Sequence, residues 1–197
     1  MKPKLYGLIL VGGKSTRMGR DKDLINYHGK PHREFLFDLA SLFCDRVFYS
    51  IRREQENEMI NLPVIIDENV YQGPFNGLLS AYHKNNKVAW LVLACDLPLL
   101  DAKSIQKLVE SRDPDHYATT YATRKTGLPE PLVAIWEPTG LRKALKFIKK
   151  TSSLSARKFL TGANPKLVHP ENDRVLYNAN SIEDLEKIKK LLGTHDP

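Results

Sequence analysis

Four short apolar runs in the first half of the chain predict buried strands. They cover residues 5–11 (LYGLILV), 47–51 (VFYSI), 63–67 (PVIID) and 89–95 (AWLVLAC). Apolar residues at helical spacing predict a helix over 32–43, a polar stretch up to Met59 is helix-like, and residues 73–77 open another helix that runs to about His83. Strands that are apolar along their whole length and alternate with helices are typical of a parallel sheet covered on both faces.

The second half continues this alternation. The pattern predicts a helix over 101–111, strands over 116–123 and 132–136, helices near 139–150, 154–161 and 181–192, and a strand near Val175. No repeat, low-complexity segment or linker composition divides the chain. We therefore expect a single domain over 1–197, with an α/β fold of three layers around a mostly parallel central sheet.

Composition narrows the class of protein. No run approaches the roughly 20 apolar residues of a membrane span, and the N-terminus lacks a secretory signal, which predicts a soluble, cytoplasmic protein. Cys44 and Cys95 have no metal-ligand spacing, and neither do the six histidines, for which surface positions are expected. The net charge of +7 favours anionic partners. Nucleic acid is the least favoured of these, because aromatic residues do not interleave with the basic ones.

Each of the four early strands ends in polar residues. Gly12 and Gly13 lead into a loop that carries Lys14, Arg17, Arg20 and Lys22, and the other three strands end near Ser50, Asp67 and Asp96. Ligands of open α/β sheets bind beyond the carboxyl ends of the strands, so these residues predict one site, with cations for phosphates and a carboxylate for Mg²⁺. The alternatives are a solvated basic loop and an Asp96 that only caps the next helix.

The sequence Gly13-Lys14-Ser15 resembles the end of a P-loop, but the rest of that motif is missing. A P-loop has a glycine five positions before its Gly-Lys-Ser, and this chain has Leu8 there. The stretch is better interpreted as a strand followed by a glycine turn and a basic loop, in which the glycines let the backbone approach phosphate closely.

The motifs together resemble those of the molybdenum cofactor guanylyltransferases, in the NTP-transferase group with a Rossmann-like fold. The resemblance rests on residues 10–13 with Arg17-Met18-Gly19 and Asp21-Lys22, on Gly73-Pro74 with Gly77, on Cys95-Asp96 with Pro98, and on 177–180. It implies a nucleotide-binding part over about 1–100 and an acceptor-binding part over about 101–197. The nucleotide-binding residues that it implies are Leu10, Val11, Gly12, Gly13, Lys22, Ser50, Asp67, Gly77 and Asp96. The chain departs from the family pattern at Val11, Ser50 and Phe75-Asn76.

By this resemblance, the protein transfers GMP from GTP to the phosphate of molybdenum-molybdopterin and releases pyrophosphate. The acceptor phosphate is already an anionic nucleophile, so no general base is required. Arg17, Lys22 and Asp96 are the implied catalytic residues, and Asp96 the implied ligand of Mg²⁺. Cys95 ends an apolar run and is expected to be a buried small hydrophobe rather than a nucleophile.

Three residues are candidates for binding the acceptor: Pro131, Asn178 and Asn180. For each, a structural interpretation stays open. Residues 129–131 suit a rigid turn before a strand, and 178–181 suit a strand end followed by a helix cap at Ser181.

Three other functions remain open at this stage. They are cytidylyl transfer to the pterin, nucleotidyl transfer to a sugar phosphate, and a cofactor-binding chaperone without catalysis. The resemblance also allows transient contact with proteins that deliver molybdopterin or receive the cofactor. It predicts neither a nucleic-acid partner nor a membrane partner.

Overall fold

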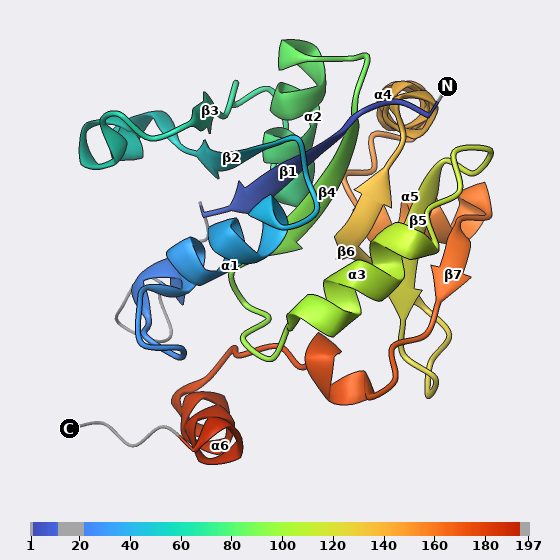
Figure 1. The fold of residues 1–197 in the computed structure, drawn as a ribbon. Coiled ribbons are helices and arrows are strands. Elements are labelled where there is room, and N and C mark those ends of the chain that lie inside the picture. Colours follow the sequence, from blue (N-terminus) through green and yellow to red (C-terminus); the bar gives the residue numbers. More distant parts are fainter. Residues whose placement is uncertain (1, 12–21, 194–197) are drawn as a thin grey trace.

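The structure is a computed structural model that describes residues 2–11 and 22–193, and it shows one twisted sheet with helices on both faces (Figure 1). Seven strands lie in the order β3-β2-β1-β4-β6-β5-β7. Their bounds are β1 Leu5–Leu10, β2 Arg46–Ile51, β3 Val64–Ile66, β4 Ala89–Ala94, β5 Ala118–Ala122, β6 Pro129–Trp136 and β7 Lys166–Val168. Among the strands of the described residues, β6 alone runs antiparallel to its neighbours, β4 and β5. The mostly parallel three-layer α/β fold is therefore confirmed.

Alternate residues of the central strand β4 serve two separate cores. Leu91 and Leu93 pack with α1 (His32–Ser41) and α3 (Ala102–Glu110) on one face. Trp90 and Val92 pack on the other face with α2 (Pro74–Lys84), α4 (Pro138–Thr151) and α5 (Ala156–Ala163). All six residues of β4 are buried, as expected of a strand covered on both sides. None of the helices described is long and apolar enough to cross a membrane.

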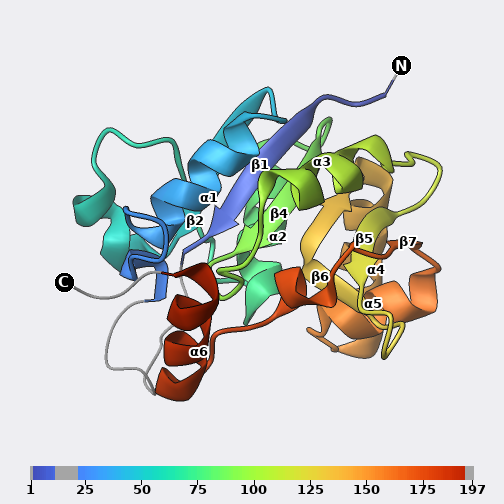
Figure 2. The ribbon, with the colours of Figure 1, turned by 60° about the horizontal axis from the view of Figure 1, so that its bottom comes forward.

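The last helix, α6 (Ile182–Leu192), lies away from both faces, beside the carboxyl end of β4 (Figure 2). Its Ile188 packs with Tyr27 and Ala179 in a small third core. The segment before α6 therefore passes the edge of the sheet at which β1 and β4 end.

Two sequence predictions about strands were wrong. The expected strand near Val175 is a 3-10 helix, η3 (Asp173–Leu176), because the Asn172 side chain accepts the backbone N–H of Arg174 and caps a turn. The expected turn at 129–131 belongs to β6, which begins at Pro129 rather than at Leu132. The helix-like stretch up to Met59 is a 3-10 helix, η2 (Arg53–Met59).

His32 also corrects the sequence analysis, which expected surface histidines. Its side chain is fully buried at the start of α1, and its ring lies 5.3 Å from that of Tyr27 and 6.0 Å from that of His28. Burial, together with the neighbouring His28, lowers the pKa of His32 to about 3. The ring is therefore neutral at physiological pH.

We expect this buried histidine to make the protein sensitive to acid. The folded-state pKa of His32 lies below its unfolded value near 6.5, so its neutral form stabilises the fold above pH 6.5 and that stability is lost as the pH falls toward 3. Between pH 7 and pH 5 the free energy of unfolding should fall by about 2 kcal/mol more in the wild type than in His32→Phe. Denaturant unfolding at the two pH values measures this, and equal losses in both proteins would contradict the assignment.

Candidate functional site

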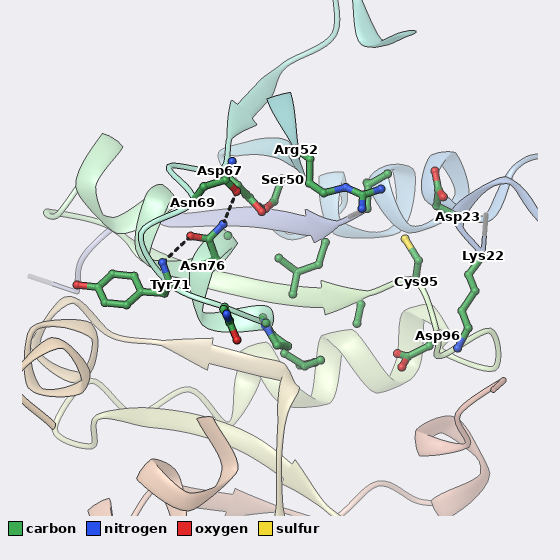
Figure 3. Close-up of a pocket in the computed structure, with 18 residues that line it drawn as sticks. Lys22, Asp23, Ser50, Arg52, Asp67, Asn69, Tyr71, Asn76, Cys95 and Asp96 are labelled. Carbon is green, nitrogen blue, oxygen red and sulfur yellow. Dashed lines mark hydrogen bonds between the residues drawn. The ribbon is translucent and has the colours of Figure 1, made fainter. Parts of the chain in front are cut away.

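A cavity of about 460 Å³ opens where β1, β2, β3 and β4 end (Figure 3). Because these strands are parallel, their carboxyl ends meet at one edge of the sheet. The described residues that the sequence predicted for a nucleotide site all line this cavity: Leu10, Val11, Lys22, Ser50, Asp67, Gly77 and Asp96. Gly12, Gly13 and Arg17, with Lys14 and Arg20, lie outside the described residues.

One end of the cavity is built by Ser50, Asp67 and Gly77. The Ser50 hydroxyl donates a hydrogen bond of 2.7 Å to Asp67 Oδ1. A Cβ atom on Gly77 would lie 2.1 Å from Ser50 Oγ and 3.2 Å from Asp67 Oδ1, so only glycine leaves room for this pair. Burial raises the pKa of the Asp67 carboxyl, and the hydrogen bonds from Ser50 and Asn76 and the charge of Arg52 oppose that rise. We call this the Asp67 end. It offers the Asp67 carboxylate as a hydrogen-bond acceptor, in space that Gly77 leaves open because it has no side chain.

The other end of the cavity is built by Asp96 and Lys22 (Figure 3). Asp96 Oδ1 is buried and has no hydrogen-bond partner among the described residues. Burial raises the pKa of Asp96, and the charge of Lys22 opposes this. We call this the Asp96 end. Asp96 does not cap α3: that role belongs to Asp101, whose carboxylate accepts the backbone N–H of Ser104 at 2.8 Å.

The segment before α6 closes the Asp96 end from outside. The Ala179 N–H donates to the backbone carbonyl of Asp96 at 2.8 Å, and Lys22 Nζ donates to Asn180 Oδ1 at 2.8 Å. Ser181 is the N-cap of α6, as one interpretation of the sequence had it. The structure thus brings Asn180 to Lys22, while Asn178 and Asn180 themselves do not line the cavity.

Pro131 lies inside β6 and is buried. Its carbonyl accepts the indole N–H of Trp136 at 3.0 Å. It does not line the cavity, but the next residue, Leu132, does. The antiparallel direction of β6 also brings Glu130 near Asp96, whose charge adds to burial in raising the pKa of Glu130, while Arg157 opposes the rise.

Sequence reasoning did not assign several residues that line the cavity. Arg52 follows the end of β2, and Asn69, Tyr71 and Asn76 lie in or beside the connection from β3 to α2. Asn76 Oδ1 accepts the backbone N–H of Tyr71 at 3.1 Å, so it holds that connection in place. Two signals were available, since Arg52 comes just after Ser50 and Asn76 lies between Gly73 and Gly77.

The Asp96 end can be compared with what Mg²⁺ requires of a protein. Mg²⁺ commonly takes one or two protein carboxylates and completes its shell with substrate phosphates and water. A buried carboxylate oxygen without a partner fits that requirement. The described residues contain no group of three or more His, Cys, Asp or Glu side chains that could hold a metal by themselves. They therefore form no metal site built from protein ligands alone. Neighbouring Cys95 is buried with a pKa raised well above its usual value, as expected of an inert thiol.

Comparison with known proteins shows the family to which the chain belongs. Residues 7–168 match the family model of the MobA-like NTP transferase domain. The molybdenum cofactor guanylyltransferase of Pseudomonas entomophila is 32% identical over 182 residues, which cover 89% of this chain and 93% of that protein.

A second relative is longer. The molybdenum cofactor biosynthesis bifunctional protein of Synechocystis sp. is 38% identical over 189 residues, which make up 93% of this chain but only 53% of that protein. This chain therefore spans about half the length of the bifunctional relative.

A solved structure resembles the fold closely. It is the molybdopterin-guanine dinucleotide biosynthesis protein A of Archaeoglobus fulgidus, with a TM-score of 0.77 and 20% sequence identity, over 95% of this chain and 98% of that one. At that identity the match supports the fold alone.

Proposed function

Because the chain belongs to the family of MobA-like NTP transferase domains, we propose that it is a guanylyltransferase acting on molybdenum-molybdopterin. It transfers GMP from GTP to the acceptor phosphate and releases pyrophosphate. One observation carries this proposal. The same cavity has the Asp67 carboxylate above Gly77 at one end, and at the other end Lys22 with the Asp96 carboxylate, whose Oδ1 has no hydrogen-bond partner among the described residues. The relative from Pseudomonas entomophila, which is named for this activity, supports the choice of acceptor.

The Asp67 end favours guanine among the bases. Guanine carries N1–H and the 2-amino group side by side, and an ionised carboxylate accepts from both. Cytosine has one exocyclic amine beside an acceptor nitrogen, so it matches a carboxylate less well. Ser50 occupies Oδ1 of Asp67 with one hydrogen bond and still leaves acceptor positions for a base.

At the Asp96 end, the residues suit charge stabilisation. The acceptor phosphate attacks the α-phosphorus of GTP, and the bond from that phosphorus to the bridging oxygen of pyrophosphate breaks. Lys22, with Arg17 from outside the described residues, offsets negative charge on the departing pyrophosphate. Asp96 would hold Mg²⁺, which supplies Lewis-acid polarisation of phosphate oxygens when bound.

The experiment that tests the proposal begins with base choice. Thermal unfolding with Mg²⁺ and GTP, CTP, ATP or UTP in turn is expected to show the largest rise in Tm for GTP. Turnover is then followed as pyrophosphate release from GTP in the presence of molybdenum-molybdopterin. A larger rise in Tm with CTP, or pyrophosphate release that needs a sugar phosphate, would contradict the proposal.

Replacement of Lys22 by alanine is expected to weaken binding of GTP by roughly tenfold or more and leave binding of guanosine nearly unchanged. The reason is that Lys22 contacts phosphates and not the base, and a charge-assisted hydrogen bond contributes about 1.5–3 kcal/mol. Calorimetric titration of both ligands measures this. The control is Lys87→Ala, which removes the same charge from an exposed position away from the cavity. Equal losses for GTP and guanosine would place Lys22 elsewhere.

A further inference from the structure

Arg52 lies between the two ends of the cavity. It follows β2 directly, and Figure 3 shows its side chain extending from beside Ser50 toward Asp23 and Lys22. It is one of the residues that line the cavity. The base is expected at the Asp67 end and the outer phosphates at the Asp96 end. Arg52 therefore lies beside the part of a nucleotide that joins the two, the ribose and the α-phosphate.

The charge of the Arg52 guanidinium acts on Asp67, but the guanidinium forms no close ion pair in the part of the chain that the structure describes. Its Nε is buried and has no hydrogen-bond partner there. No ion pair within 4.0 Å among those residues includes it; the ion pairs found are Arg33 with Asp23, Arg112 with Glu137, Arg157 with Glu130 and four that involve lysine or histidine. A buried donor that has lost its water without gaining a partner is unfavourable by about 1–3 kcal/mol. Such groups are uncommon unless a ligand satisfies them.

The backbone of Arg52 is held in place by two hydrogen bonds with Gln55. The Arg52 N–H donates to Gln55 Oε1 at 3.1 Å, and the Gln55 N–H donates to the Arg52 carbonyl at 3.0 Å. This reciprocal pair starts η2 and holds residue 52 extended at φ −78° and ψ 156°. The Arg52 side chain therefore begins at a fixed position at the rim of the cavity. The next residue, Arg53, is exposed and does not line the cavity.

We propose that Arg52 binds the α-phosphate of the nucleotide, the phosphate at which transfer occurs. The planar guanidinium presents adjacent N–H donors that match two oxygens of one phosphate. Its positive charge offsets the negative charge on the equatorial oxygens as the attacked phosphorus becomes five-coordinate. This inference rests on the proposed function for the location of the base.

A series of ligands with zero, one and three phosphates, which we call the ladder, tests the inference directly. Guanosine, GMP and GTP are titrated by calorimetry into the wild type, Arg52→Ala and Arg53→Ala. Arg52→Ala is expected to weaken binding of GMP and GTP by at least about tenfold and of guanosine by less than about twofold. Arg53→Ala, which removes the same charge one residue later, should leave all three affinities near those of the wild type. Thermal unfolding of each variant checks that it is folded, and Arg52→Met, which keeps the apolar stem, replaces Arg52→Ala if the latter is not.

The ladder separates the ways in which the inference can fail. A loss that is equal for guanosine and GMP would place Arg52 on the ribose or base and overturn the inference. A loss for GTP without one for GMP would place Arg52 on the outer phosphates. If Arg53→Ala had the same effects as Arg52→Ala, the losses would come from net charge and not from a contact of Arg52. Either result also overturns the inference. If the wild type prefers cytidine nucleotides, the guanylyl proposal fails, while the same ladder with cytidine, CMP and CTP still decides the role of Arg52.

Discussion

Replacement of Asp96 by alanine is expected to reduce turnover by a factor on the order of 100 or more, about 2.7 kcal/mol of activation free energy, without loss of the fold. The carboxylate is the proposed ligand of Mg²⁺, and its buried Oδ1 has no partner among the described residues. Burial raises its pKa in the folded state, so the ionised form does not stabilise the fold at neutral pH. The contact from Ala179 is to the backbone carbonyl and survives the replacement. Pyrophosphate release and Tm, measured on the same preparation, report the two effects.

Asp101→Ala is the matched control for this prediction. Asp101 caps α3 through the backbone N–H of Ser104, so its loss should lower the free energy of unfolding by about 1 kcal/mol and leave turnover nearly unchanged. The two aspartates should thus show opposite patterns. An Asp96→Ala protein that keeps more than about a tenth of wild-type turnover would remove Asp96 from the catalytic residues.

Gly77→Ala is expected to weaken GTP binding by roughly 10-fold to 100-fold and to lower the free energy of unfolding by about 0.5–2 kcal/mol. The added methyl would lie 2.1 Å from Ser50 Oγ, so the hydroxyl must turn away from Asp67, and the methyl then fills the floor of the Asp67 end. The lost hydrogen bond to a carboxylate destabilises the fold by about 1.5–3 kcal/mol, whereas alanine in place of glycine within α2 stabilises it by about 1 kcal/mol. Calorimetric titration of GTP and thermal unfolding measure the two quantities.

Two further variants isolate the mechanism at Gly77. Gly162→Ala places the same methyl in helix α5, where no atom lies within 4 Å, and should leave GTP binding unchanged. Ser50→Ala combined with Gly77→Ala should bind GTP no more weakly than Gly77→Ala alone, because the hydrogen bond to Asp67 is already broken. Additive losses in the double variant would show that the methyl acts independently of Ser50.

The sequence predicted which residues come together at the cavity, because parallel strands convert a linear pattern into a spatial one. Ser50, Asp67 and Asp96 lie at or just after the ends of apolar runs, and the shared direction of the strands brings them to one edge. Side-chain contacts across the cavity have no such linear signature. The hydrogen bond from Asn76 to Tyr71 and the position of Arg52 depend on the path of connections between elements, and periodicity does not report that path.

The errors at the other end of the sheet also have local causes. The sequence analysis did not expect β7, which has three residues, too few to show an alternating pattern. It forms because Lys166, Leu167 and Val168 pair with β5. Pro129 and Pro131 argued against a strand, since proline lacks the N–H of a regular ladder. The pairing of β5 with β6 shifts register between Thr120 and Tyr121, and this irregularity accommodates both prolines. His32 was misplaced because a polar residue at the start of a helix is ordinarily solvated.

The reversed direction of β6 bears on how proteins of this architecture diversify. A loop after a parallel strand must lead into a crossover helix, whereas residues 123–128 turn straight back from β5 into β6 at the edge of the sheet where the cavity opens. After an insertion or deletion, that hairpin must still connect only the end of β5 to the adjacent start of β6. During divergence, the hairpin can therefore change length and chemistry beside Glu130 and Leu132 while the ends of β1 to β4 keep their positions. Changes confined to this short segment leave the Asp67 end and the Asp96 end of the cavity intact.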